Sequence, residues 1–457
     1  MAALIGQNNR MLAPPLSASL ADQLQADPFV GYAYSYPHKT AYRTLTPARN
    51  LREVWSDEPR ESLFLYLHVP FCEMRCGFCN LFTFSQPAEE WVARYLGALR
   101  QQMQVVTTEI PEARFTRLAL GGGTPTFLKT AELERLFTQL ESVLGLQFAH
   151  VPISLEASPA TVDDDKLALL RHYHVDRLSL GIQSFLPADL GAMGRPQQMA
   201  DVWHAIDRIR QAGFPVLNLD LIYGAQGQTQ ARWLASLREA AQCEPEEIYI
   251  YPLYVRPLTG LGGKSCSQHD ERLDRYREAR DWLLANNYEQ VSLRMFRRRG
   301  QRDAPSPMYC CQSDGMIGLG VGARSYTRDL HYASRFAVRQ KSILGIIQEY
   351  VAQTPSDMTQ VTHGFALNGD EQRRRYVLLS LLQVSGLDRG DYQQRFGADL
   401  LVDFPQLADL VDHELASLEA SRLMLTPAGL ELSDALGPWL YSAEVKLRMQ
   451  EYPWTEA

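Results

Sequence analysis

Three features are missing from this 457-residue sequence, and each absence excludes a class of protein. No apolar run is long enough to cross a bilayer, so no membrane span is expected. The first residues do not combine a charged flank with a long apolar stretch, so no signal peptide is expected. There is no excess of Lys and Arg: the formal net charge of -8 argues against binding to nucleic-acid phosphates.

Cysteine is scarce, and its distribution does not suit a disulfide framework. The chain has seven cysteines, an odd number, and three of them fall within residues 72–79. We therefore expect a protein of a reducing compartment, the cytoplasm.

From about residue 63, short apolar runs alternate with longer segments of helical periodicity, such as 89–106 and 131–145. This alternation is typical of βα repeats and a parallel sheet. It predicts an α/β fold built on a partial or full (βα) TIM-like barrel. The predicted strands are LFLYLHV (63–69), RLALGGG (117–123), ISLEASP (153–159), RLSLGIQSF (177–185), VLNLDLIYG (216–224) and EIYIYPLYV (247–255).

We divide the chain into an N-terminal arm (1–55), the barrel (56–330) and a C-terminal domain (331–457). In the last of these, 372–383 and 409–420 are predicted helices and 422–433 a hairpin, which together suggest a winged-helix-like domain. The acidic balance of the chain favours a lid or packing role for this domain over DNA binding.

The segment HVPFCEMRCGFCN carries three thiols, Cys72, Cys76 and Cys79, directly after the first predicted strand. Thiolates select iron–sulfur clusters or zinc. A structural zinc site needs four ligands, but no His or Cys occurs in the dozen residues after Cys79, and His68 precedes the loop. The spacing favours a cluster with one open iron over zinc or inert thiols.

Polar residues and a glycine turn fall at the ends of the predicted strands, where a βα barrel carries its functional groups. Each of them is commonplace alone. Together they offer what an amino acid joined to a ribose requires: a guanidinium for a carboxylate, and acidic or amide groups for ammonium and hydroxyls. The groups at strand ends are His68, Gly121-Gly122-Gly123-Thr124, Glu156, Gln183 and Asp220, and the set that suits an amino acid joined to a ribose is Glu156, Gln183, Arg195 and Asp220.

The other cysteines are expected to be bystanders. Cys310 and Cys311 are adjacent, which suits a single metal poorly, so a structural role is favoured. Cys243 follows a predicted helix, and Cys266 falls in a Gly/Ser-rich loop.

Motifs along nearly the whole chain make it resemble a known family, the radical S-adenosylmethionine enzymes of the oxygen-independent coproporphyrinogen III oxidase class. The motifs are Ser35-Tyr36-Pro37, Tyr66 with HVPFC, the three cysteines, GGGTPTFL, ISLEASP, RLSLGIQSF, NLDLIYG, GLGVGARSY and LTPAGLELS.

The resemblance implies a [4Fe-4S] cluster and S-adenosylmethionine as cofactors, a small-molecule, porphyrin-like substrate, and an electron donor such as flavodoxin or ferredoxin. In that family an electron from the cluster cleaves S-adenosylmethionine to methionine and a 5′-deoxyadenosyl radical, which abstracts hydrogen from the substrate. The implied cluster ligands are Cys72, Cys76 and Cys79. The implied cofactor contacts are Tyr66, Phe78, Gly122, Gly123, Thr124, Glu156, Gln183, Arg195 and Asp220.

Three departures from the family pattern concern the substrate. Asn80-Leu81-Phe82 stands where the oxidases often have Gly-Cys, Tyr254 replaces a small residue, and Arg324 occupies a position expected to be apolar. They predict a more polar, differently shaped cavity. Similar scaffolds also serve as haem chaperones and as methyltransferases, including haem-degrading ones, so a haem-trafficking protein and a methyltransferase remain alternatives to an oxidase.

Overall fold

The computed structural model describes residues 19–25, 27–31, 36–262, 271–301, 315–419 and 421–454. Ser35, Cys266, Cys310 and Cys311 lie outside these residues. Within the described part of the chain, no helix is long and apolar enough to cross a membrane.

The chain divides into two compact units that differ from the predicted segments. One unit comprises the described residues of Arg43–Ser267 and Gly300–Ala366. The other comprises those of Met1–Tyr42, Gln268–Arg299 and Leu367–Trp454. The arm is therefore split at residue 42, and the barrel unit continues past the predicted boundary at 330 to residue 366.

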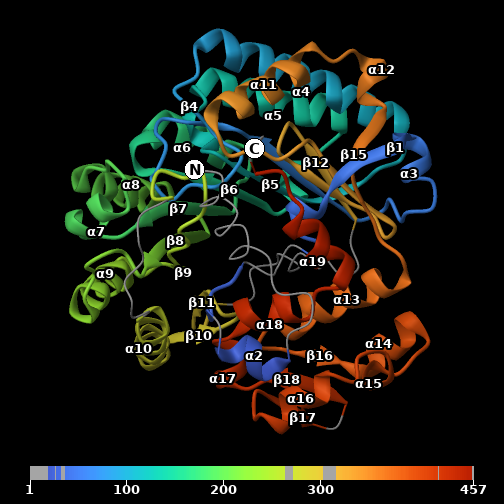
Figure 1. The fold of residues 1–457 in the computed structure, drawn as a ribbon. Helices are drawn as coiled ribbons and strands as arrows, with labels where there is room; N and C mark the ends of the chain where they lie inside the picture. The colour runs from blue at the N-terminus through green and yellow to red at the C-terminus, as the bar shows by residue number, and fades with distance from the viewer. Residues whose placement is uncertain are drawn as a thin grey trace. The chain divides into compact units, whose positions relative to one another are not determined.

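The barrel unit is built around a run of parallel strands in the order β2-β5-β6-β7-β8-β9 (Figure 1). Each predicted strand is present, so the α/β prediction is confirmed. The strands are β2 (Leu63–Val69), β5 (Phe115–Gly122), β6 (Ile153–Ala157), β7 (Arg177–Gln183), β8 (Val216–Tyr223) and β9 (Glu247–Pro252).

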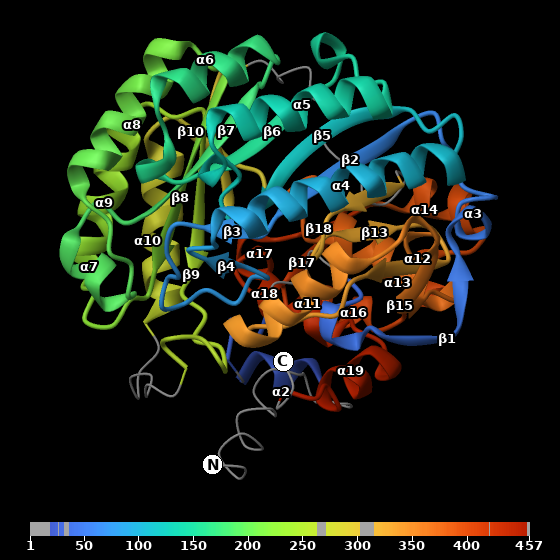
Figure 2. The ribbon, with the colours of Figure 1, turned by 90° about the horizontal axis from the view of Figure 1, so that it is seen from above.

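Alternation along the strands separates a packed face from a polar face. In β2, Leu63, Leu65 and Leu67 are fully buried, whereas the intervening Phe64 and Tyr66 are only half-buried. The buried face packs against helices that form an arc outside the strands in Figure 2. These helices are α4 (Glu89–Glu109), α5 (Thr130–Leu144), α6 (Asp164–His172), α8 (Met199–Ala212) and α9 (Gln230–Gln242), with the shorter α7 (Pro187–Ala192) after β7. The opposite face is left as the polar inner face of the barrel.

On the other side of β2 the sheet continues with one more parallel strand and then becomes antiparallel, and the described strands form an open, partial barrel. β12 (Met316–Leu319) pairs parallel to β2, and the order then continues β13-β14-β15-β1. In sequence, β1 and α3 precede the six predicted βα units, and the other elements of this extension follow them. Its elements are β13 (Arg324–Tyr326), β14 (Leu330–Ala333), β15 (Gln360–Ala366), β1 (Arg43–Asn50), α3 (Leu51–Val54), α11 (Gln340–Ala352) and α12 (Pro355–Met358).

The second unit combines helices with a small antiparallel sheet in the order β16-β18-β17, which confirms the predicted C-terminal helical domain. A short hairpin, β10 (Tyr288–Gln290) and β11 (Met295–Arg298), follows α10 (Arg272–Ala285). The remaining elements are α2 (Leu20–Gln25), α13 (Gly369–Leu381), β16 (Leu387–Asp388), α14 (Arg389–Phe396), α15 (Leu400–Asp403), α16 (Leu407–Asp412), β17 (Ala416–Glu419), β18 (Arg422–Leu425), α17 (Pro427–Leu430), α18 (Ser433–Trp439) and α19 (Ala443–Gln450).

The predicted hairpin at 422–433 is wrong in its second half. β18 pairs instead with the preceding β17, which was predicted to be helical. After β18, the Thr426 side chain accepts a hydrogen bond from the Gly429 backbone, and Pro427 occupies the first helical turn. A Thr cap followed by Pro is a helix start signal, so this segment forms α17 instead of a strand.

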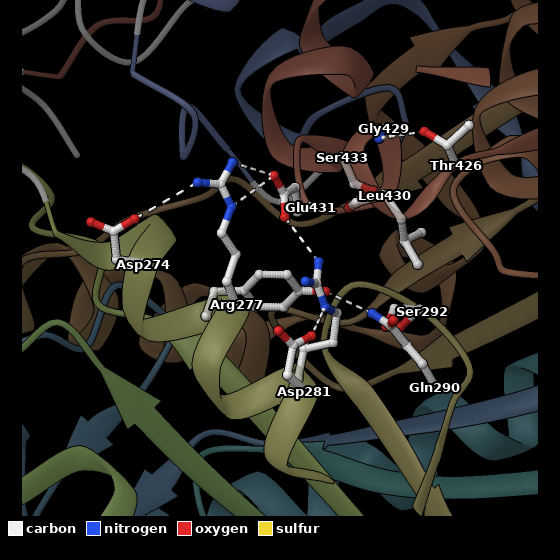
Figure 3. A network of polar contacts seen from close by, with 12 residues as sticks. Asp274, Arg277, Asp281, Gln290, Ser292, Thr426, Gly429, Leu430, Glu431 and Ser433 are labelled. Atoms are coloured by element: carbon white, nitrogen blue, oxygen red, sulfur yellow. Dashed lines mark hydrogen bonds and ion pairs between the residues drawn. The ribbon is translucent and has the colours of Figure 1, made fainter. Parts of the chain in front are cut away.

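Ion pairs tie α10 to the C-terminal elements of the same unit (Figure 3). Arg277 and Arg280 both donate to Glu431, at 2.6 and 2.9 Å. Arg294 and Asp434 form a second pair that is almost completely buried. These contacts explain why residues 271–299 belong to this unit rather than to the barrel.

Candidate active site

The three cysteines lie in a closed loop that follows β2. Cys72 ends the short strand β3 (Phe71–Cys72), which pairs with β4 (Phe84–Ser85) and so joins the two ends of the loop. The Cys79 backbone N–H donates to the Cys76 carbonyl at 3.1 Å. All three thiols are half-buried.

Each sulfur has a hydroxyl or guanidinium group beside it. Thr124 Oγ1 lies 3.5 Å from Cys72 Sγ, and Thr83 Oγ1 lies 3.6 Å from Cys79 Sγ. Arg195 Nη1 donates to Cys76 Sγ at 3.0 Å. Burial raises the pKa of Cys72 to about 12 and raises that of Cys76, against the opposing charge of Arg195. A metal binds the thiolate, so metal binding at these cysteines would release the thiol protons.

The arrangement fits a cluster better than a single ion. Within the described ranges, no three or more His, Cys, Asp or Glu side chains gather closely enough to hold one metal ion. In an iron–sulfur cubane each thiolate binds a different iron, so the sulfurs need not meet at one point. The three thiols of this loop match the three thiolate ligands of such a cluster, and each has a hydroxyl or guanidinium group beside it.

Gly77 fastens the cysteine loop to two other loops of the barrel unit. Its N–H donates to the Gly194 carbonyl at 3.1 Å, and its carbonyl accepts from the Leu261 N–H at 2.7 Å. A Cβ on Gly77 would lie 2.7 Å from the Met193 carbonyl oxygen, and one on Gly260 would lie 3.1 Å from Gly77 Cα. Close backbone approach of this kind requires glycine.

Phe78, the next residue, is half-buried and packs against an apolar cluster beneath the loop. The cluster consists of Leu190, Met193, Ile222, Ala225, Leu253 and Leu261. This packing explains the aromatic residue between Cys76 and Cys79 without reference to a ligand, and the predicted contact of Phe78 with the cofactor stays a prediction.

The predicted glycine turn approaches the cysteine loop through its backbone. Gly122 has φ +112°, and a Cβ there would lie 2.5 Å from the His68 ring. At Gly123 a Cβ would lie 3.0 Å from Cys72 Sγ. His68 in turn bonds the Phe82 carbonyl through Nε2 at 2.9 Å and contacts the Tyr66 hydroxyl through Nδ1 at 3.3 Å. Glycine is thus needed at both positions for the turn to lie against the loop.

Polar side chains at the carboxyl ends of β6, β7 and β8 face the interior of the barrel unit, the region proposed below as the cofactor cavity. Glu156 is exposed, and Gln183 and Asp220 are half-buried. Protein atoms nevertheless enclose Glu156 and Asp220, and desolvation is the main influence on the pKa of each. A side chain that is accessible to water and enclosed by protein faces an internal space, so these residues line the inside of the barrel.

The two carboxyl groups in this cavity are held by neighbours and have raised pKa values. Glu156 accepts a hydrogen bond from the Gly122 N–H at 3.1 Å, and Asp220 accepts from Ser179 at 2.8 Å. Burial, together with the charge of Asp220, raises the pKa of Glu156 to about 7. Burial also raises the pKa of Asp220.

The structure brings the predicted residues to one end of the barrel unit. Arg195 differs from the prediction in that its contacts there are with the protein itself. Arg195 is buried and donates to the Gly181 carbonyl at 2.6 Å as well as to Cys76. Its predicted contact with a cofactor carboxylate stays a prediction. The sequence reasoning missed Thr83, Gly77 and Gly260, because their roles depend on contacts between distant loops.

All three departures lie in the barrel unit, and two of them have ring contacts. The Arg256 guanidinium lies 4.6 Å from the centre of the Tyr254 ring. Arg324 lies 5.9 Å from the Tyr326 ring, and its charge opposes the burial that raises the pKa of Tyr66. Arg324 is therefore near Tyr66 on the inner face of the sheet.

Comparison with known families finds a match in each of two stretches of this chain. A model of the radical SAM superfamily matches residues 66–240, which include the cysteine loop and the strands that line the cavity. A model of the HemN C-terminal domain matches residues 367–432. The chain thus contains a radical SAM domain followed by a HemN C-terminal domain. Radical SAM proteins use a [4Fe-4S] cluster and S-adenosylmethionine, the two cofactors predicted from the sequence.

Individual relatives confirm the resemblance to oxygen-independent coproporphyrinogen III oxidases. The oxidase of Escherichia coli is 27% identical over 428 residues, covering 87% of this chain and 91% of that protein. The heme chaperone HemW of Bacillus subtilis is 26% identical over 374 residues, covering 80% of this chain and 95% of that protein. The solved structure of E. coli coproporphyrinogen III oxidase has the same fold, with a TM-score of 0.73 over 90% of this chain and 97% of that one at 23% identity.

Proposed function

We propose that this protein is a radical SAM enzyme in which Cys72, Cys76 and Cys79 hold the [4Fe-4S] cluster and the polar cavity binds S-adenosylmethionine. The observation that carries the proposal is the loop of three thiols, each beside a hydroxyl or guanidinium group, next to the polar interior of the barrel unit. The bound cluster and S-adenosylmethionine together supply a 5′-deoxyadenosyl radical that abstracts hydrogen from the substrate.

In this proposal the side chains and backbone of the protein bind S-adenosylmethionine and orient it. Glu156, with Asp220 nearby, offers negative charge to the cofactor's cationic groups, and Arg195 offers positive charge to its carboxylate. The backbone of Gly122 and Gly123 lines the approach without a side chain in the way. The apolar cluster beneath Phe78 excludes water from one side of the loop.

We propose a porphyrin-like small molecule as the substrate, and an oxidation distinct from that of coproporphyrinogen III. The proximity of Arg324 to Tyr66 supports a cavity that is more polar than in the oxidases. An arginine there would bind an acidic group of the substrate. Coproporphyrinogen III should therefore give slow or uncoupled turnover. Efficient conversion to protoporphyrinogen IX would refute this divergence.

A haem chaperone is the second candidate, and the similarity to HemW over 95% of that protein's length favours it. The longer alignment with the E. coli oxidase, 428 residues against 374, supports the enzyme. A methyltransferase on the same scaffold would share the cluster chemistry and differ in product.

We also propose that the protein works in the cytoplasm, because a reducing compartment keeps the thiol ligands from forming disulfides.

The deciding experiment is anaerobic reconstitution with S-adenosylmethionine and dithionite, followed by mass spectrometry. An enzyme should form 5′-deoxyadenosine, and its true substrate should stimulate that formation. Cys76→Ala is the negative control, because it lacks one proposed ligand. Stoichiometric haem binding with no 5′-deoxyadenosine under any substrate would favour the chaperone instead.

A further inference from the structure

Three side chains on neighbouring strands of the barrel unit form a closed ring of hydrogen bonds. Asn218 Nδ2 donates to Ser179 Oγ at 2.7 Å and to Asp220 Oδ1 at 2.9 Å. Ser179 Oγ donates to Asp220 Oδ2 at 2.8 Å. Ser179 belongs to β7, and Asn218 lies opposite it on β8, two residues before Asp220. Residues two apart on a strand share a face, so all three side chains lie on the inner face of the sheet.

The ring gives each donor a single direction. The two hydrogens of the Asn218 amide nitrogen are used by Ser179 and Asp220. Because Ser179 Oγ accepts from this amide, its one hydrogen is directed to Asp220 Oδ2. The opposite orientation of the amide would place its oxygen against the carboxylate, so the nitrogen faces the ring. Each oxygen of the Asp220 carboxylate thus receives one hydrogen bond from the strands around it.

Burial alone does not explain the choice of asparagine at position 218. The Asn218 side chain is completely buried, and among the described residues its Oδ1 has no hydrogen-bond partner. A buried polar atom without a partner destabilises a folded protein. Leucine has the same branched shape and no polar atom, so it would avoid this penalty. The amide is therefore explained by the two groups that it binds, Ser179 and Asp220.

The ring favours the charged form of a carboxyl group that burial disfavours. Burial raises the pKa of Asp220, whereas the charge of Arg177 and the hydrogen bonds of the ring lower it. Glu247, which pairs with Arg177 at 2.7 Å, raises it. The charge of Asp220 in turn contributes to the raised pKa of Glu156. The ring thus acts on the charge of Asp220 as well as on its direction.

Asp220 lies beside a second predicted cofactor contact, Gln183. The residue opposite Asp220 on β7 is Gly181, which has no side chain. A Cβ on Gly181 would lie 2.9 Å from Gln183 Nε2, so the Gln183 amide occupies the space next to Asp220. Two predicted contacts therefore lie together, and the ring fixes one of them.

We propose that Asn218 and Ser179 are positioning residues that hold the Asp220 carboxylate in the orientation in which it binds S-adenosylmethionine. This inference rests on the proposed function, because it takes Asp220 as a contact of the cofactor. A side chain that is already ordered loses less conformational entropy when a ligand binds, so the ligand binds more tightly. Asn218 is completely buried, so it acts through Asp220 and does not touch the cofactor.

The test is a double-mutant cycle on anaerobically reconstituted protein, with equilibrium binding of S-adenosylmethionine as the measurement. Asn218→Leu and Ser179→Ala should each weaken binding about two- to tenfold, because the carboxylate must then be ordered on binding. In an Asp220→Ala background the same substitutions should have no further effect, because the carboxylate is gone. Ser154→Ala is the matched control: it removes a hydroxyl on the same face that accepts from Arg177, and it should bind like the wild type.

A second measurement needs no cofactor. Infrared titration of protein labelled with ¹³C-carboxyl aspartate, with the Asp220→Ala spectrum subtracted, follows the protonation of Asp220. The pKa of Asp220 should be higher in Asn218→Leu and Ser179→Ala than in the wild type, since hydrogen bonds that favour the charged carboxylate are lost. Ser179→Ala is the milder change, and it decides the test if Asn218→Leu does not fold.

Each contrary result has a defined meaning. Equal losses of affinity in the wild-type and Asp220→Ala backgrounds would overturn the proposal, because the two residues would then support the sheet in general. Wild-type affinity in both single variants, or an unchanged pKa of Asp220 in both, would also overturn it. If wild-type protein that holds its cluster did not bind S-adenosylmethionine, the proposed function would fail. The infrared titration would then still show whether the ring controls the charge of Asp220.

Discussion

The cavity of the barrel unit and the ion-pair network of the second unit use the same kinds of side chain in opposite ways. In the cavity, Glu156 and Asp220 are enclosed by protein yet accessible to water. In the network, Arg294, Asp434 and Glu431 are buried and paired with protein partners. Charges that are satisfied within the protein hold elements together, as Figure 3 shows for α10. Charges that are enclosed but still accessible are available to a ligand.

The largest effect is expected at the cysteine loop. The reconstituted protein should hold about four irons per chain, and Cys76→Ala should lose the cluster's visible absorbance while keeping its fold. Iron and sulfide analysis with circular dichroism measures both. Cys243→Ala, outside the loop, is the control and should keep its iron. A full complement of iron in Cys76→Ala would remove Cys76 from the ligand set.

In the second unit, loss of one buried partner should destabilise without affecting the cluster. Arg294→Met leaves the Asp434 carboxylate buried without its guanidinium, which should cost about 3–5 kcal/mol in the free energy of unfolding. Urea titration measures it. Arg294→Met/Asp434→Leu should recover most of that loss, and both variants should load iron normally. A loss of iron in either variant would contradict the separation of roles.

In the barrel unit, Arg195→Ala should weaken S-adenosylmethionine binding by about ten- to a hundred-fold, since a charge-assisted contact contributes roughly 1.5–3 kcal/mol. Because Arg195 also donates to Cys76 Sγ, the cluster spectrum should shift while iron content is kept. Equilibrium binding under anaerobic conditions measures the affinity. Arg208→Ala, which removes a surface ion pair, is the control. Unchanged affinity would leave Arg195 with only its contacts to the cysteine loop and Gly181.

The smallest effect concerns pH. The pKa of Glu156 is about 7 in the free protein, so the carboxylate is charged above that pH and neutral below it. Affinity for the cationic cofactor should be highest above pH 7 and fall by up to about tenfold between pH 8 and 6. Glu156→Gln should bind weakly at every pH and lose this dependence. A parallel pH dependence in Glu156→Gln would assign the titration to another group.

The local patterns in the sequence predicted the parallel half of the fold well. Apolar strands such as Leu63–Val69 and the polar residues after them follow from alternation and from the rule that barrel function lies at strand ends. The turn at Gly122 was likewise visible as a glycine run.

What the sequence could not predict depends on contacts between distant segments. The two backbone hydrogen bonds of Gly77, with Gly194 and Leu261, join residues more than a hundred positions apart in the sequence. No local sequence pattern predicts such contacts. Residues 271–299 belong to the second unit because Arg277 forms an ion pair with Glu431 and Arg294 forms one with Asp434. In the predicted hairpin at 422–433, the helix cap at Thr426 starts α17 where a second strand was expected.

The hydrogen bonds of Gly77 with Gly194 and Leu261 also affect the point during synthesis at which the cysteine loop can take its final structure. All three proposed ligands have left the ribosome once residue 79 has emerged, but the backbone partners that fix their loop are Gly194 and Leu261. A nascent chain that ends before Leu261 can form the β3–β4 pair that joins the ends of the loop, but it lacks one of the two backbone contacts that hold Gly77. We therefore expect the proposed cluster to be held stably only once the first 261 residues have emerged, and the cysteines of shorter fragments to oxidise more readily.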